Sequence, residues 1–296
     1  TNEDLTTEMS EATLPVLTLY DGKTAINELY GYTEKMDAAY MRDTITPIGE
    51  NRLLPVTVQT YQTAVDKISY EIRSLDAQRL IANADVTSYT ENKGMISMEL
   101  PIQNLLEKNE EYLLVIQLES GDRMIYYYTR IIESQNSYVS ECIDFVKQFN
   151  DTTFDSEKAS SLSTYMEKTT GDNTTLQYVT LNNSLNQVSW AEFHGTRLTT
   201  PVPSVKEITS TYNVIVLDYV VTRVGQNGQS EYYNVEEYYR VRYTNTRMYL
   251  LNFERTMEEI FRGENDSISG NDILLGIRSK DVEYQTNESG KVVTFV

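Results

Sequence analysis

The stretch ELPIQNLLEKNEEYLLVIQLESGDRMIYYYTRII, residues 99–132, decides the fold predicted for the first half of this chain. From Tyr112 onward, apolar side chains occupy every second position: Tyr112, Leu114, Ile116 and Leu118. Alternate side chains of a strand share one face, so this run predicts a half-buried antiparallel strand. Ser120-Gly121-Asp122 then predicts a hairpin turn into a second strand over 123–132.

Short β-type runs of the same kind extend back to the start of the chain. They cover residues 14–20, before an Asp21-Gly22 turn, and then 53–61, 68–74, 79–81, 95–100, 112–119 and 123–132. Short strands with turn residues between them are typical of a two-sheet sandwich. We therefore predict an all-β sandwich domain over residues 1–135, with an N-terminal extension.

The residues before Tyr112 resemble a tyrosine corner. A Leu and a Pro, then Leu105, then a polar corner, precede Tyr112 and its alternating apolar run, as in fibronectin type III and related immunoglobulin-like domains. The resemblance covers about residues 53–132, and it implies that the Tyr112 hydroxyl bonds back to the preceding loop. The chain departs from that family in two ways: its one Trp, Trp190, lies outside the region, and residues 26–50 read as an insertion.

The hydrophobic period changes after Gln135, from every second residue to every third or fourth. A helix over 137–150, capped by Asn136 or Ser137, is predicted by five apolar residues on one side: Val139, Cys142, Ile143, Val146 and Phe149. A second helix is predicted over 156–169. The polar residues 171–187 are predicted to be loop. Strands are predicted at 188–194, 204–224, 230–243 and 247–253, with a hairpin at the Asn227-Gly228 pair and a short helix at 255–261. Two helices followed by an antiparallel sheet predict an α+β domain over 136–263. Its element order is similar to that of the nuclear transport factor 2 (NTF2-like) fold.

Residues 264–296 are predicted to be a linker and the start of a further β unit, with strand candidates around Tyr284 and Val293. The chain starts at Thr1 without Met, and it ends in an apolar strand-like run. We interpret it as a piece of a longer protein from which an upstream segment, with any membrane anchor, has been removed.

Composition limits the possible partners. The formal net charge is -19, with 40% hydrophobic and 23% charged residues. This is ordinary for a folded protein, and the negative charge disfavours nucleic acid and anionic lipid surfaces while leaving cationic partners open. The single Cys142 cannot form an internal disulfide, which fits either a reducing cytosol or the exterior of a bacterium that does not rely on disulfides. We favour an extracytoplasmic, membrane-anchored location.

As a whole, the chain resembles membrane-anchored extracellular proteins of Gram-positive bacteria. The resemblance rests on Asn2-Glu3-Asp4-Leu5, on Leu14-Pro15-Val16 and on Ser69-Tyr70-Glu71-Ile72-Arg73-Ser74-Leu75, with a propeller-like part expected from Val292-Val293-Thr294-Phe295 onward. It implies no particular activity.

Catalytic and metal-binding motifs are missing from the sequence. Glu192 and His194 are the least improbable acid–base pair, but no nucleophile motif accompanies them, and a structural role is favoured. Cys142 lies on the apolar side of the first predicted helix, where a buried, unreactive thiol is expected. No calcium loop, phosphate loop or cysteine pair is present. We predict no cofactor, no metal and no catalytic residue.

Tyrosine is the one residue in excess, with 23 copies. Adjacent tyrosines in strands point to opposite faces, so one of each pair faces solvent or a partner, although Tyr is also a common strand residue. The predicted interaction surface therefore comprises Tyr127, Tyr232, Tyr238, Trp190 and His194. Three functions stay open. The first is a noncatalytic extracytoplasmic module with a structural role or with a protein or carbohydrate as its binding partner. The second is a sensory or regulatory domain with a ligand pocket within residues 137–262, and the third is an acid-dependent hydrolase.

Overall fold

The computed structural model describes residues 13–102, 106–166, 175–191 and 193–260, and four short strands beyond them. The described part of the chain is mostly β, with 51% of its residues in strands. The four short strands form two pairs: β17 (Ile268–Ser269) with β18 (Asp272–Ile273), and β19 (Tyr284–Thr286) with β20 (Val293–Phe295). The last pair falls on the two predicted strand candidates.

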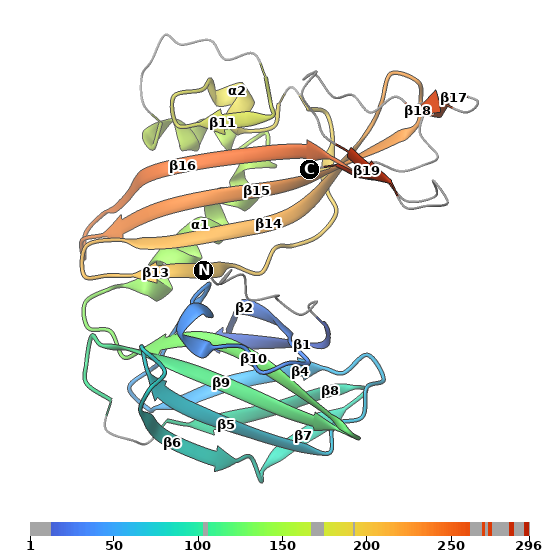
Figure 1. Ribbon diagram of the computed structural model, residues 1–296. Helices are drawn as coiled ribbons and strands as arrows, with labels where there is room; N and C mark the ends of the chain where they lie inside the picture. Colours follow the sequence, from blue (N-terminus) through green and yellow to red (C-terminus); the bar gives the residue numbers. More distant parts are fainter. Residues whose placement is uncertain are drawn as a thin grey trace, which may run out of the picture.

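Two five-stranded sheets make up the first half of the chain and pack face to face (Figure 1). The first sheet has the order β2 (Thr24–Gly31), β1 (Thr13–Asp21), β4 (Leu53–Gln59), β8 (Met95–Pro101), β7 (Tyr89–Asn92). The second has the order β3 (Ile45–Pro47), β10 (Arg123–Ile132), β9 (Glu111–Ser120), β5 (Lys67–Ser74), β6 (Leu80–Asp85). The seven predicted strands are present, and the sandwich-like packing agrees with the sequence.

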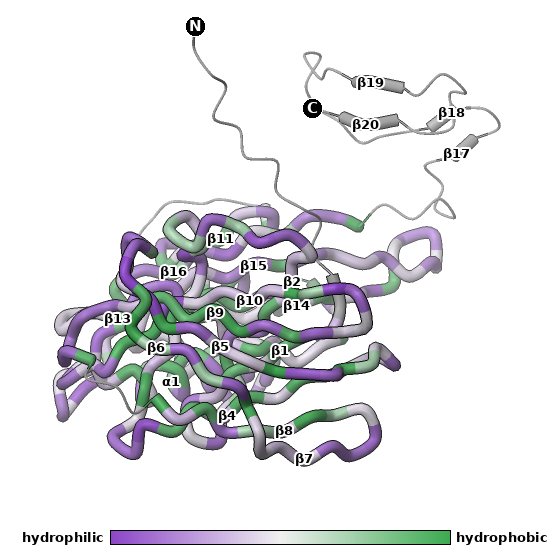
Figure 2. The backbone as a smooth tube through the Cα atoms, turned by 60° about the horizontal axis from the view of Figure 1, so that its bottom comes forward, coloured by the Kyte–Doolittle hydropathy of each residue, from purple (hydrophilic) through white to green (hydrophobic). Residues whose placement is uncertain are grey.

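Burial follows the predicted alternation. In β9 the side chains of Tyr112, Leu114, Ile116 and Leu118 enter the core between the two sheets, and hydrophobic and hydrophilic stretches alternate along the strands (Figure 2). The predicted bond of the tyrosine corner is present, because the Glu107 backbone N–H donates to the Tyr112 hydroxyl at 3.0 Å.

Replacing Tyr112 by Phe removes only that hydroxyl. We expect the free energy of unfolding to fall by about 1–2 kcal/mol, because the Glu107 N–H loses its acceptor next to a buried ring. Urea unfolding of the Tyr112→Phe variant measures this, with Tyr61→Phe, at an exposed tyrosine, as the control. An unchanged midpoint would mean that the corner bond does not contribute to the stability of the sandwich.

Residues 26–50, predicted to be an unexplained insertion, add two strands and cover the outer face of the second sheet. They form β2, the short 3-10 helix η1 (Ala38–Tyr40) and β3, which runs parallel to β10. Met36 and Ala38 pack on Leu113, Val115 and Tyr128, forming a small separate core. This explains why β9 is buried on both faces over much of its length.

The second half of the chain is a six-stranded antiparallel sheet with helix α1 (Val139–Thr153) across one face (Figure 1). The order is β11 (Tyr178–Thr180), β16 (Met248–Glu259), β15 (Ser230–Tyr243), β14 (Asn213–Val224), β12 (Thr196–Arg197), and β13 (Ser204–Ile208) also pairs with β14. The hairpin at Asn227-Gly228 is confirmed by the pairing of Val224 with Ser230. The five residues that predicted the buried side of α1 are all buried: Val139, Cys142, Ile143, Val146 and Phe149.

Two helix predictions need correction. The residue before α1 is Tyr138, in a left-handed conformation and without a side-chain cap, so Asn136 and Ser137 do not cap the helix. The predicted helix at 156–169 is a 3-10 helix, η2 (Ala159–Thr164), within its described part. Here the Ser161 and Ser163 hydroxyls bond back to nearby carbonyls, which favours such short turns over an α-helix.

Four further predictions after residue 170 are wrong. Residues 175–187, predicted to be loop, include β11 and the first turn of α2 (Leu185–Val188), which a capping box between Ser184 and Gln187 starts. In its described residues, 188–191 and 193–194, the predicted strand 188–194 therefore comprises the end of α2 and turn residues. The predicted strand 204–224 is interrupted by a turn in which Thr209 bonds to Tyr212. The described part of the predicted helix 255–261 is the end of β16 instead, whose pairing with β15 reaches Glu259.

The two halves share a buried junction. Ile26, Ile45 and Ile132 from the sandwich belong to the core beneath α1. Asn27, fully buried and with a positive φ of 49°, links the two sides. Its amide nitrogen donates to the Ile45 carbonyl and the Thr46 hydroxyl, both at 2.9 Å, and its Oδ1 accepts from the Val205 backbone N–H at 2.7 Å. Strand β2 is thereby held against β13.

Candidate binding site

The five residues predicted as an interaction surface do not lie together on the surface. Tyr127 and Trp190 are 0% and 4% exposed, so these two predictions are wrong. Tyr127 faces the core of the sandwich, where its hydroxyl donates to the Pro15 carbonyl at 2.7 Å. Tyr232 and Tyr238 are half-buried on the face of β15 opposite α1.

His194 is exposed at the edge of a shallow hollow. The hollow has a volume of about 420 Å³ and also includes Phe193, Arg223 and Glu231. Arg223 donates to Glu231 at 2.7 Å and lies over the Phe193 ring, so its guanidinium is engaged within the sheet. Glu192 lies outside the described residues, and its pairing with His194 stays a prediction.

Among the described residues, the densest cluster of buried side-chain hydrogen bonds lies beneath α1 and centres on Glu237. The Glu237 carboxylate accepts four hydrogen bonds, from Tyr219 (2.8 Å), Arg255 (2.7 Å), Asn150 (2.7 Å) and Tyr239 (2.6 Å). Both Glu237 and Arg255 are 0% exposed. With four donors and no solvent contact, this carboxylate is saturated, so we assign it a structural role.

Each of the three guanidinium nitrogens of Arg255 donates a hydrogen bond, including the one from Nε to Glu237. Its terminal nitrogens donate to the carbonyls of Gln187 and Val188, and the Trp190 ring lies 4.0 Å from the guanidinium carbon. Burial raises the pKa of the Tyr219 and Tyr239 hydroxyls well above 10, so both stay protonated and donate to Glu237. The network therefore connects the three strands β14, β15 and β16 with one another and with the helices α1 and α2.

Cys142 is buried as predicted, and burial raises the pKa of its thiol to about 11. The folded state therefore favours the thiol, and the resulting stabilisation is lost as the pH rises from about 9 towards about 11. We expect Cys142 not to react with a thiol-specific reagent at pH 8 until denaturant is added. Rapid labelling of the folded protein would contradict this burial.

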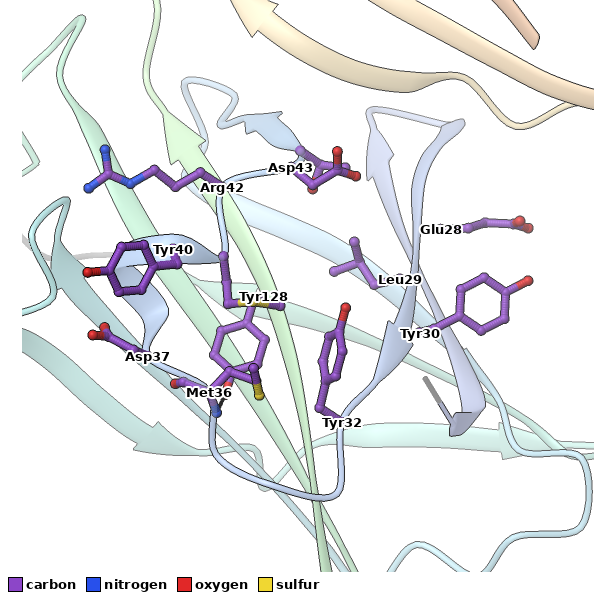
Figure 3. Close-up of a pocket in the computed structure, with 12 residues that line it drawn as sticks. Glu28, Leu29, Tyr30, Tyr32, Met36, Asp37, Tyr40, Arg42, Asp43 and Tyr128 are labelled. Carbon is purple, nitrogen blue, oxygen red and sulfur yellow. Dashed lines mark hydrogen bonds between the residues drawn. The ribbon is translucent and has the colours of Figure 1, made fainter. Parts of the chain in front are cut away.

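The most enclosed of the cavities lined by described residues lies where the insertion meets the second sheet, and its volume is about 540 Å³. It runs between the end of β2 and the segment 36–44 (Figure 3). We call it the tyrosine groove; its walls comprise Glu28, Leu29, Tyr30, Tyr32, Met36, Asp37, Tyr40, Met41, Arg42, Asp43, Thr44 and Tyr128.

Hydrogen bonds fix the base of the tyrosine groove. Tyr128, at 8% exposure, accepts from the Met36 backbone N–H at 2.8 Å. Burial raises the pKa of its hydroxyl to about 12. Backbone bonds of 2.9 Å in both directions join Tyr32 to Tyr126 in β10. Rings of Tyr32 and Tyr128 lie side by side, with centroids 6.0 Å apart and planes tilted by 57° (Figure 3).

A glycine lets the two sheets meet at this point. A Cβ on Gly31 would overlap the side chains of Ile125 and Tyr127, so only glycine allows β2 to cross so close to β10. Tyr30 and Tyr40, on either side of the groove, are 52% and 81% exposed. The result is an accessible aromatic surface along the walls of the groove.

The acids of the groove differ in their pairing. Asp43 bonds to Lys206 of β13 at 2.8 Å, and the Asp37 carboxylate accepts from the Ala39 N–H at 3.0 Å. Glu28 has no ion-pair partner among the described residues, and burial raises the pKa of its carboxyl. Arg42 points away from the groove and donates to the Leu75 carbonyl (Figure 3).

No model of a known protein family matches the chain, and no curated protein sequence matches it significantly. Among the described residues, no three His, Cys, Asp or Glu side chains are grouped as a metal site requires. In the same residues, no helix is long and apolar enough to cross a membrane. The geometry of the tyrosine groove is therefore the basis for assigning a function.

Proposed function

We propose that this chain is a noncatalytic extracytoplasmic module of a larger cell-surface protein, and that it binds a partner in the tyrosine groove. The observation that supports this most strongly is a preformed cavity of about 540 Å³ with an apolar, aromatic base and accessible tyrosines. Ligand pockets are usually concave, mostly apolar and in this range of size. The proposal that tyrosines form the binding surface thus rests on tyrosines other than those the sequence indicated, all of them in the sandwich half of the chain.

The proposal includes a division into an immunoglobulin-like or fibronectin-like sandwich at 1–135 and an α+β domain of NTF2-like outline at 136–263. The orders β1-β4-β8-β7 and β10-β9-β5-β6 support the first part, since they match the A-B-E-D and G-F-C-C′ orders of immunoglobulin sandwiches. The Tyr112 corner bond supports it too. The extracytoplasmic location rests on the sequence resemblance alone, and the full-length reading frame tests it.

A ligand pocket beneath α1 is not favoured as a second candidate. That interior holds Phe149 in ring contact with Tyr239 and Phe253, at centroid distances of 5.7 and 5.5 Å. The saturated Glu237 network occupies the space beside these rings. Hydrolysis by Glu192 and His194 has no supporting geometry among the described residues.

Crystals soaked with small fragments of different chemistry test the binding function. We expect amines, aromatic amides and small sugars that bind at all to collect in the tyrosine groove, beside Tyr32 and Tyr128. The best-formed alternative is the acidic hollow of about 550 Å³ on the face of the third sheet opposite α1, lined by Asp218, Glu236 and Glu258. Fragments gathered there, or nowhere near Tyr32, would refute the proposal.

A further inference from the structure

We propose, building on the binding function above, that the tyrosine groove receives an arginine or lysine side chain from an extended segment of a partner protein. The class of ligand is therefore a cationic peptide. The inference rests on three features: the apolar base, the tilted tyrosine pair and the distribution of charge around the rim.

The base suits the aliphatic stem of a long cationic side chain. Leu29, Met36 and Met41 supply apolar walls beside the two central rings. Arginine and lysine bury their methylene stems on apolar surface while the charged head stays near polar groups. Their heads also gain from lying over a tyrosine face, by about 0.5–2 kcal/mol. The Tyr32 ring, half-buried at the centre of the groove, can provide such a face.

The charge around the groove favours a cation. Three carboxylates, those of Glu28, Asp37 and Asp43, lie in its walls against one guanidinium, that of Arg42. Arg42 is directed away towards Leu75, and within the described part of the chain the only ammonium bound to these acids is that of Lys206, on Asp43. The whole chain carries a net charge of -19, which attracts a basic segment over a longer range.

A carbohydrate fits the same groove less well. Sugar rings stack on flat, open aromatic faces, whereas the planes of Tyr32 and Tyr128 meet at 57°. Tyr128 is only 8% exposed, and its hydroxyl is engaged by the Met36 backbone. The exposed Tyr30 and Tyr40 lie on opposite sides of the groove and form no shared platform (Figure 3).

Methionine methyl groups provide the test, since Met36 and Met41 lie in the groove and Met98 lies in the sandwich core. The whole chain is labelled with ¹³C at the methionine methyls and titrated with the blocked peptide Gly-Gly-Arg-Gly-Gly. Matched peptides carry norleucine or glutamate in place of arginine, and maltotriose serves as a carbohydrate probe. We expect the arginine peptide to shift Met36 and Met41, to leave Met98 unchanged, and to bind less tightly at high salt.

Two variants sharpen the titration. Tyr32→Leu keeps apolar bulk without a ring, and it should weaken the arginine peptide about fivefold. Asp43→Asn removes a carboxylate and leaves the Lys206 ammonium without its partner. It should therefore weaken binding of the arginine peptide more than Tyr32→Leu does. Tyr61→Leu, at an exposed tyrosine outside the groove, should bind the peptide as the unchanged chain does.

The other outcomes separate this inference from the proposed function. Equal shifts with the norleucine peptide would overturn the cationic class but leave the groove as a binding site. Shifts with maltotriose and none with arginine would overturn the peptide class in favour of carbohydrate. If no probe shifts Met36 or Met41, both the inference and the proposed function fail.

Discussion

Replacing Arg255 by Met should lower the free energy of unfolding by about 3–5 kcal/mol, because it leaves the buried Glu237 carboxylate without its counter-ion. Glu237 and Arg255 are both 0% exposed and joined at 2.7 Å. Methionine fills much of the space of the arginine stem, so the loss reports the missing charge rather than a cavity. Equilibrium urea unfolding of the Arg255→Met variant measures it.

The matched control is Arg242→Met, the same substitution at an exposed position on β15. It should change the unfolding free energy by no more than about 0.5 kcal/mol. A loss of less than about 1 kcal/mol at Arg255 would contradict its burial, because a hydrated guanidinium contributes little to stability. Circular dichroism before unfolding shows whether each variant still folds.

Replacing Asn27 by Leu should cost about 2–4 kcal/mol, since it leaves buried backbone groups of both halves without partners. The Val205 N–H and the Ile45 carbonyl both bond to the Asn27 side chain. The φ of 49° at this residue adds strain for leucine, because side chains other than Asn and Asp seldom adopt it. Urea unfolding gives the total loss.

A second variant separates the two effects at this position. Asn27→Gly tolerates the positive φ but removes the side-chain bonds to Val205, Ile45 and Thr46, so its loss reports those bonds without the strain. Its expected loss is therefore smaller than that of Asn27→Leu. Asn234→Leu, at an exposed position of β15, is the matched control. Equal stability of Asn27→Leu and the unchanged chain would contradict the role of Asn27 in the junction.

The sequence predicted those strands in which core and solvent sides alternate without interruption. Strand β4, with its regular burial pattern, and β15, with Tyr233, Val235, Tyr239 and Val241 on one face, are examples. Strand β2 was missed because Asn27 forms a bulge in its pairing with β1, which breaks the alternation. The end of β16 was read as a helix because Arg255, a charged residue, occupies a core position between Phe253 and Met257.

The tyrosine groove could not be read from the sequence in the same way. Its walls come from the segment 28–44 and from Tyr128, and only the tertiary crossing of β2 over β10 brings them together. The spacing of tyrosines indicates on which face of a strand each ring lies. It does not indicate whether other elements cover that face, as they do at the buried Tyr127 but not at the accessible Tyr30. Excess tyrosine and methionine within residues 26–50 was the one available signal.

The central claim is that the tyrosine groove exists before any partner binds, with both of its walls fixed by the fold. Amide hydrogen exchange of the free protein, followed by nuclear magnetic resonance, tests it at two positions. The Met36 N–H bonds to Tyr128 on one wall, and the Val205 N–H bonds to Asn27, which holds β2 on the other. We predict that both exchange as slowly as the core amides of β9 and β14. Exchange at the rate of an unprotected peptide at either amide would contradict the claim.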